Sequence, residues 1–434
     1  MFFMFSNDLE TAAKSRMVCC LITLLISACG SDSQDEVQED SQSSQVTMVS
    51  SGAASSINRS SGLEYFEAVP MGYPVLPVYF PSPKVLPSNP LTLAKVELGR
   101  FLFYDRKLSI NQERSCGDCH QPAKAFTDGK ALAVGVTGMQ IHARNSMSLT
   151  NVAYNAGFNW ANPNVHNLEQ QVHGVLFNET PIELGWSDAE DQILNRLKED
   201  VTYADLFNAA FSDDADPFTV ANVERALASF ERALISGNSA FDAFEAGNES
   251  ALSEAAKKGK ELFFSEQLEC FHCHGGFNFS QAVDHEGIVL DQLDFHNNGL
   301  YNIAGTGDYP ANNTGLWEFN SEASNMGKFR APTLRNIALT APYMHDGSIA
   351  NLDAVIDHYA RGGRLIEEGE LAGDGNLSPY KSELLAGFIL SDQDKAHLKA
   401  FLESLTDWAF ICASQLQDPY GNHPMHSRCA ELNL

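Results

Sequence analysis

The chain has 434 residues, a formal net charge of −28 at neutral pH and nine cysteines. This length is sufficient for two buried cores. The strong negative charge argues against nucleic acid and anionic lipid surfaces as binding partners, although it permits electrostatic steering of a basic protein.

The N-terminal segment has the features of a bacterial export signal. Lys14 and Arg16 precede an apolar run at 17–26 that is too short to span a bilayer and is followed by small residues. Because Cys29 comes directly after these small residues, as in a lipobox, we expect cleavage after residue 28 and lipidation of Cys29. An ordinary export signal with an incidental cysteine is the alternative. A diacyl-type anchor would hold the mature protein in the periplasm on a bacterial membrane, which we expect to be the outer membrane.

The next two segments are not expected to form a core. Residues 29–62 are rich in Ser, Gln and Asp and lack apolar periodicity, so they are predicted to form the anchor and a disordered tether. Prolines are frequent in residues 69–90, which favours an extended chain over a helix.

The rest of the chain contains a duplicated pattern. Two predicted helices, at 93–105 and 254–266, share the pattern Gly-x-x-Leu-Phe, and each leads into a Cys-x-x-Cys-His motif. We therefore predict a mainly helical protein with two cytochrome-c-like domains, at 63–250 and 251–434.

The two motifs, CGDCH and CFHCH, are typical attachment sites for c-type haem. In each motif two thiols would bond covalently to the porphyrin, and the adjacent histidine would be an axial iron ligand. A zinc site is the alternative, but it would need further Cys or His at ligand spacing, and His272 is the only such extra. The residues assigned to the two haems are Cys116, Cys119, His120, Cys270, Cys273 and His274.

Further helices are predicted from apolar spacing and caps. Residues 191–207 are expected to form one helix, and Ser391 opens another with a capping-box pattern. The segment 284–330 is rich in Gly and Asn and is predicted to be a long, irregular and functional loop. Apolar residues that recur at helical spacing are Val220, Val223, Leu227, Phe230 and Leu234 in one helix, and Leu398, Phe401, Leu402 and Leu405 in the helix after Ser391.

The cysteine count leaves one pair. Cys19 and Cys20 lie in the export signal, Cys29 is assigned to the lipid and four cysteines are assigned to haem. Cys412 and Cys429 remain, and in an oxidising compartment they predict a disulfide.

Several motifs together resemble those of a known family. The run CGDCHQPAKAFTDG, the segments RNSMSLTNVAYN and ETPIELG, and the stretch FRAPTLRNIALTAPYMHDGSIANLDAVIDHYARGG are similar to those of the di-haem bacterial cytochrome c peroxidases and their relatives MauG and MbnH. The resemblance covers residues 90–408, and residues 144–155 are most similar to the MbnH-like branch. It implies an oxidoreductase that reacts with hydrogen peroxide.

The resemblance assigns roles around the first haem, whose distal side would be open to peroxide. Glu183 of PIELG matches the acidic residue that moves a proton between the peroxide oxygens. Gln171 matches the distal amide, although this chain has two extra residues between Gln171 and Glu183. His142 lies in the loop that supplies a distal histidine in some cytochrome c peroxidases, but the surrounding sequence differs, and a loop histidine is the alternative.

Other assigned positions lie between the haems. Trp160 matches the tryptophan that connects them, where an oxidisable indole could relay an electron; a core tryptophan is the alternative. Asn145, with the backbone carbonyls of Arg330 and Pro332, matches a calcium site, and calcium prefers such oxygen ligands.

Tyr359 stands where cytochrome c peroxidases have a methionine ligand to the second iron. A thioether raises the reduction potential and suits a haem that accepts electrons, whereas a phenolate favours ferric and higher states, as in MauG-like proteins. The alternative is a packed tyrosine, with His358, Met326 or Met344 as the ligand.

The leading hypothesis is a MauG/MbnH-like enzyme in which peroxide produces a high-valent di-haem state that oxidises a side chain, expected to be Trp, of a partner protein. The second is a cytochrome c peroxidase that takes electrons from a small c-type cytochrome. The third is a di-haem electron carrier.

Overall fold

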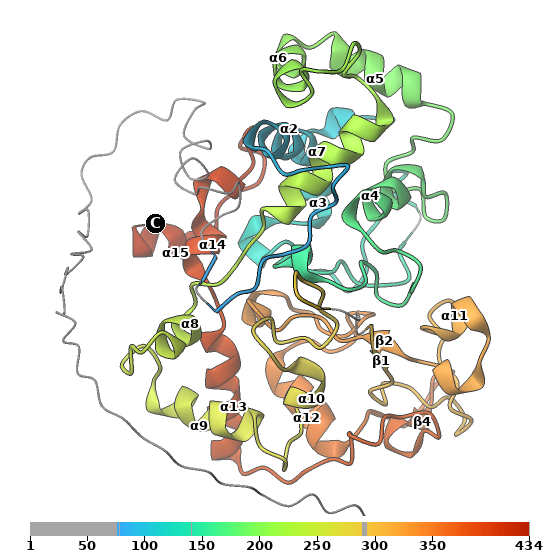
Figure 1. Cartoon of the computed structure of the whole chain (residues 1–434). Helices are drawn as coiled ribbons and strands as arrows, with labels where there is room; N and C mark the ends of the chain where they lie inside the picture. Colours follow the sequence, from blue (N-terminus) through green and yellow to red (C-terminus); the bar gives the residue numbers. More distant parts are fainter. Residues whose placement is uncertain (1–75, 78, 140, 289–292, 434) are drawn as a thin grey trace, which may run out of the picture. The chain divides into compact units, whose positions relative to one another are not determined.

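The computed structural model describes residues 76–77, 79–139, 141–288 and 293–433. The predicted export signal, Cys29 and the tether lie outside this part of the chain. Secondary structure in the described part is mainly helical, with two small pairs of two-residue antiparallel strands, which confirms the predicted fold class (Figure 1). No helix in these ranges has both the length and the apolar character needed to cross a bilayer.

Helices α2 (Leu93–Tyr104) and α7 (Val220–Arg232) form the first close helix pair (Figure 1). Gly99 on α2 lies directly against the backbone carbonyl of Ala226 on α7, and any larger residue there would clash with it. Of the predicted apolar positions, Val220 is half-buried and the other four are buried, including Leu234, which lies two residues beyond the end of α7. The glycine therefore allows two backbones to approach closely.

Helices α9 (Glu254–Phe263) and α13 (Asp392–Ser404) repeat this arrangement. Gly259 takes the place of Gly99 and lies against the backbone carbonyl of His397. Ser391 caps α13 as predicted, because its side chain accepts a hydrogen bond from the backbone N–H of Asp394. The two Gly-x-x-Leu-Phe segments thus have the same structural role, and the duplication inferred from the sequence is present in the fold.

The prediction of one continuous helix at 191–207 was wrong. The segment forms two helices, α5 (Glu190–Lys198) and α6 (Val201–Ala210). Asp200 separates them, and its carboxylate accepts a hydrogen bond from the backbone N–H of Thr202 at the start of α6. Aspartate is a strong N-cap residue, and it begins a new helix within an otherwise helical pattern.

The segment 284–330 was predicted to be irregular throughout, and this was wrong in part. It contains strand β1 (Phe295–His296), helix α11 (Trp317–Asn320), the 3-10 turn η4 (Ala323–Asn325) and strand β2 (Phe329–Arg330). Strands β1 and β2 pair with each other in antiparallel fashion. Two distant parts of the segment are therefore held together.

The remaining elements are short. The other helices are α3 (Cys116–Cys119), α4 (Leu168–Phe177), α8 (Ala240–Glu245), α10 (Phe271–His274), α12 (Leu352–Arg361), α14 (Trp408–Cys412) and α15 (Ser427–Leu432). The other 3-10 turns are η1 (Arg106–Leu108), η2 (Pro122–Lys124), η3 (Val152–Tyr154), η5 (Ile337–Leu339), η6 (Gly375–Leu377) and η7 (Ser414–Leu416). Strand β3 (Leu365–Ile366) pairs with β4 (Gly373–Asp374).

Two large apolar cores lie in the described part of the chain. The first includes Phe103 of α2 and Phe230 of α7, and the second includes Phe263 of α9 and Phe401 of α13. Cys412 and Cys429 form a disulfide, and both belong to the first core together with Phe410 and Leu416. The C-terminal segment is therefore anchored on the helices of the first core.

Candidate functional site

The first Cys-x-x-Cys-His motif borders a cavity of about 370 Å³. Helix α3 is a single turn, so it places the thiols of Cys116 and Cys119 close together, and neither is in a disulfide. The Nδ1 atom of His120 donates a hydrogen bond to the backbone carbonyl of Phe126, 2.8 Å away. This bond fixes the tautomer and leaves Nε2 as the ring nitrogen that can bind a metal.

The second motif borders a separate cavity of about 190 Å³. Cys270 and Cys273 are again free thiols on one short turn that includes α10. The Nδ1 atom of His274 lies 3.2 Å from the carbonyl oxygen of Phe279 and 3.1 Å from that of Pro332. Its Nε2 atom is therefore the nitrogen left for a metal, as for His120. Burial lowers the pKa of His274 to about 4, which favours the neutral imidazole that a metal requires.

Arg330 provides a test of whether the second cavity fits a haem. Its side chain is buried and lines the cavity, and its Nη1 atom has no hydrogen-bond partner in the described structure. Burial lowers its pKa to about 10. A buried guanidinium without a counter-ion is costly, and the carboxylate of a porphyrin propionate would be a suitable partner. Together with the thiol pairs and the free imidazole nitrogens, Arg330 indicates that these residues fit covalently held haem.

Gln171, Glu183 and His142 all line the first cavity. Gln171 lies on α4 on the same face as Leu168, which also lines the cavity. Glu183 follows in the loop after α4, where Asn178 donates a hydrogen bond to its carboxylate at 3.0 Å. The structure therefore brings the acid, the amide and the distal histidine candidate to the same cavity as the first motif.

The protonation of Glu183 is set by two opposing effects. Burial raises its pKa to about 7, and the hydrogen bond from Asn178 acts in the opposite direction. Such a carboxyl group can exchange a proton near neutral pH, as a general acid–base catalyst must. For His142, burial and then the nearby charge of His120 lower the pKa. A role of His142 as an iron ligand stays a prediction.

Trp160 lines both cavities. Its indole N–H donates a hydrogen bond to the backbone carbonyl of Asn145 at 2.8 Å, and its own carbonyl accepts one from the backbone N–H of Arg330 at 2.9 Å. The indole is thus fixed between the two motifs. This placement is what an electron relay requires, and it distinguishes Trp160 from a tryptophan buried in one core.

Tyr359 lies on α12 and faces the second cavity. Leu352 and Ile356 line the same cavity from the same helix, at the spacing of one helix face. Burial raises the pKa of Tyr359 to about 12, and a hydrogen bond with the side chain of Asn298 opposes this effect. A metal cation in the cavity would favour the phenolate.

The alternative ligands differ in position. Met344 also lines the second cavity, whereas Met326 and His358 do not. The Nε2 atom of His358 donates a hydrogen bond to the backbone carbonyl of Asn298 at 3.0 Å. Tyr359 and Met344 are therefore the two candidates that face the cavity.

The predicted calcium ligands take part in hydrogen bonds. These ligands are Asn145 and the carbonyls of Arg330 and Pro332. The side-chain amide of Asn145 donates to the carbonyl of Lys130 at 2.6 Å, which leaves its oxygen as a potential ligand. The carbonyl of Pro332 accepts a hydrogen bond from His274. Calcium at this position stays a prediction.

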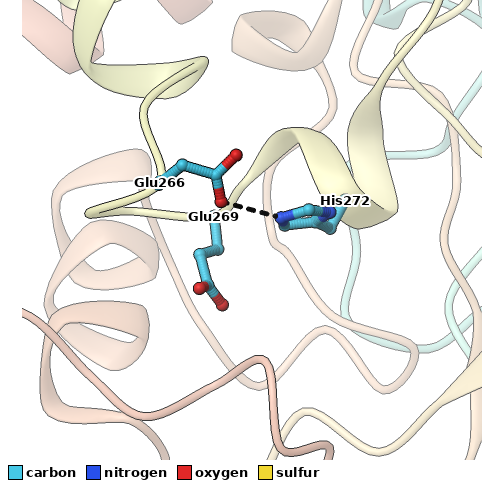
Figure 2. Close-up of side chains that lie close together, drawn as sticks. All are labelled: Glu266, Glu269 and His272. Atoms are coloured by element: carbon cyan, nitrogen blue, oxygen red, sulfur yellow. Dashed lines mark hydrogen bonds and ion pairs between the residues drawn. The ribbon is translucent and has the colours of Figure 1, made fainter.

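The zinc alternative finds no support in the described residues. The side chains able to hold a metal gather only at Glu266, Glu269 and His272, beside the second motif, with ligand atoms within 4.8 Å of one another (Figure 2). Among these three, Figure 2 joins only His272 and Glu266, 3.4 Å apart. No cysteine belongs to this group, and His272 does not line the second cavity.

Two residues near the haem sites were missed by the sequence analysis. Glu231 on α7 is only 8% exposed and lines the first cavity, and burial raises its pKa to about 8. Asn298 follows β1 and lines the second cavity. For Glu231 the helical spacing identified the apolar neighbours and gave no signal for a buried acid. For Asn298 the only signal was its place in a segment predicted to be a functional loop.

The fold and the two sites are those of a mainly helical protein whose residues fit two haems. A family model described as di-haem cytochrome c peroxidase matches residues 93–250. The chain is 33% identical over 331 residues to the methylamine utilization protein MauG of Methylorubrum extorquens, covering 76% of this chain and 82% of that protein. It is 32% identical over 355 residues to the cytochrome-c peroxidase IdrP1 of Pseudomonas sp. strain SCT, covering 78% and 86%.

A solved structure is also similar over most of its length. The crystal structure of a MauG-like protein associated with microbial copper homeostasis matches with a TM-score of 0.78 and 43% sequence identity, covering 80% of this chain and 98% of that one. The chain therefore belongs to the di-haem cytochrome c peroxidase family, which includes MauG. It is an oxidoreductase of the peroxidase type, and the family implies two haems.

Proposed function

We propose that this protein uses hydrogen peroxide to oxidise a side chain, expected to be Trp, of a partner protein. The observation that carries the proposal is Tyr359, which faces the second cavity together with Cys270, Cys273 and His274. A phenolate ligand disfavours reduction of the iron by a high-potential donor. The similarity to MauG and to a MauG-like structure supports the same function.

The bound haems would supply cleavage of the peroxide bond and storage of two oxidising equivalents. In the first cavity, the Glu183 carboxylate accepts a proton from one peroxide oxygen and returns it to the other. The Gln171 amide is placed to hydrogen-bond peroxide in the same cavity. Trp160 borders both cavities, so its indole can give an electron to the haem site on one side and take one back from the haem site on the other. Peroxide takes up two electrons and two protons and forms two waters, while the substrate side chain gives up two electrons and two protons.

A cytochrome c peroxidase that takes electrons from a small c-type cytochrome is the second candidate. It is favoured by Met344, which lines the same cavity as Tyr359 and carries the thioether such enzymes use. Relatives named as cytochrome-c peroxidases support it as well. An electron carrier without its own chemistry is the third candidate, and it would not react with peroxide.

Spectroscopy of the purified holoprotein and its Tyr359→Phe variant tests the proposal. We expect a phenolate-to-iron charge-transfer absorption in the wild type that is lost in the variant. A sulfur-to-iron absorption that survives in Tyr359→Phe would favour the peroxidase. Spectra that show two low-spin, six-coordinate irons and do not change with peroxide would leave only the carrier.

We further propose that the protein works in the periplasm, attached to the outer membrane through a lipid on Cys29. The lipobox-like sequence supports this proposal. A calcium ion at Asn145, Arg330 and Pro332 would stabilise the segment that holds Trp160, because Asn145 accepts the indole hydrogen bond. The net charge of −28 would favour encounter with a partner that presents basic residues.

A further inference from the structure

Asn298 contacts two of the side chains considered as alternative ligands of the second iron, Met344 and His358. The side-chain amide of Asn298 donates a hydrogen bond to the sulfur of Met344 at 3.2 Å. Its backbone carbonyl accepts the hydrogen bond of His358 at 3.0 Å. Asn298, Met344 and Tyr359 line the same cavity.

Both contacts restrain a competing group. The donor on the Met344 sulfur, which is a weak acceptor, holds the thioether in one position. The hydrogen bond to the backbone carbonyl of Asn298 holds Nε2 of His358 away from the cavity, which His358 does not line. Asn298 therefore restrains both of these alternative ligands, while Tyr359 lines the cavity from α12.

The segment that carries Asn298 is held in place by its neighbours. Asn297 is fully buried, and its amide donates to the carbonyl of Met326 at 2.8 Å. Its side-chain oxygen accepts hydrogen bonds from the backbone N–H of Gly299 at 2.8 Å and from the hydroxyl of Tyr309 at 2.9 Å. Gly299 has φ +69°, a conformation that favours glycine. The position of Asn298 thus depends on the fold and not on the groups it contacts in the cavity.

We propose that Asn298 is a positioning residue that selects Tyr359 over Met344 as the distal ligand of the second haem. It restrains the Met344 thioether through the hydrogen bond from its side-chain amide. This inference rests on the proposed role of Tyr359 and adds the reason why a methionine in the same cavity does not replace it.

The test compares optical and resonance Raman spectra of purified holoprotein variants. Asn298→Leu removes the hydrogen bond to Met344, and we expect about a tenfold shift of the ligand equilibrium towards sulfur, the size of effect that one hydrogen bond provides. A sulfur-to-iron absorption should appear while the phenolate band weakens. The double variant Asn298→Leu/Met344→Leu should lose the sulfur band and regain the phenolate band. Met344→Leu alone is the matched control and should resemble the wild type.

Asn298→Asp is a second variant in case the leucine variant fails to fold. It retains the shape of the side chain and loses the amide donors, so it should also move the ligand equilibrium towards sulfur. Unchanged phenolate bands and no sulfur band in the folded Asn298 variants would overturn this inference, while Tyr359 would remain the ligand. A wild-type spectrum without any phenolate band would overturn both this inference and the proposed role of Tyr359.

Discussion

The protonation state of Glu183 should determine how peroxide turnover depends on pH. Burial raises its pKa to about 7, and the hydrogen bond from Asn178 partly opposes this effect. Only the carboxylate can accept the first proton from peroxide, so activity should rise as the pH rises through about 7. With this pKa, about a tenth of the molecules carry the carboxylate at pH 6 and about nine tenths at pH 8, which predicts a roughly tenfold increase in rate.

The assay is stopped-flow reaction of the holoprotein with peroxide across this pH range. Glu183→Gln should lower the rate by about 10²-fold or more and remove the pH dependence. Asn178→Ala should move the midpoint to higher pH, because the variant loses the hydrogen bond that stabilises the carboxylate. Glu179→Gln is a matched control, since Glu179 is an exposed carboxylate in the same loop and does not line the cavity.

If Glu183→Gln retains the wild-type rate or the wild-type pH profile, the reasoning about Glu183 is refuted. A normal rate with a shifted midpoint in Glu179→Gln would show that a general charge effect of the loop, and not the buried carboxyl, sets the profile.

Other variants test the remaining assignments. Trp160→Phe should slow oxidation of the protein substrate by about tenfold, equivalent to ~1.4 kcal/mol, and leave peroxide binding normal. Trp408 borders neither haem cavity, so Trp408→Phe should not slow this oxidation. Equal rates in the two variants would contradict the relay. The double replacement Cys412→Ser/Cys429→Ser should reduce the free energy of unfolding by about 3 kcal/mol in denaturant titrations, because the disulfide closes a short loop on the first core. An unchanged denaturation midpoint would contradict this stabilising role of the disulfide. Cys29→Ser should release the protein from membranes in cell fractionation, and a membrane-bound variant would contradict the lipid anchor.

The sequence by itself determined the features that depend on local chemistry. Two cysteines and a histidine within five residues can reach one porphyrin whatever the rest of the fold does, so Cys116–His120 and Cys270–His274 were identified without a structure. The helix caps and apolar spacing also act locally, and they predicted α7 and α13. Local signals had limits, since Asp200 divided a segment whose apolar pattern suggested one helix.

Only the tertiary structure decided which distant residues meet. Trp160 borders both cavities because its contacts with Asn145 and Arg330 join segments far apart in the chain. The burial of Glu231 depends on what covers α7, and no periodicity encodes it. The contacts of Asn298 likewise depend on how the segment after β1 packs near α12. Long-range packing sets burial and hydrogen bonding, and these set the chemistry of a site whose residue types the sequence had already supplied.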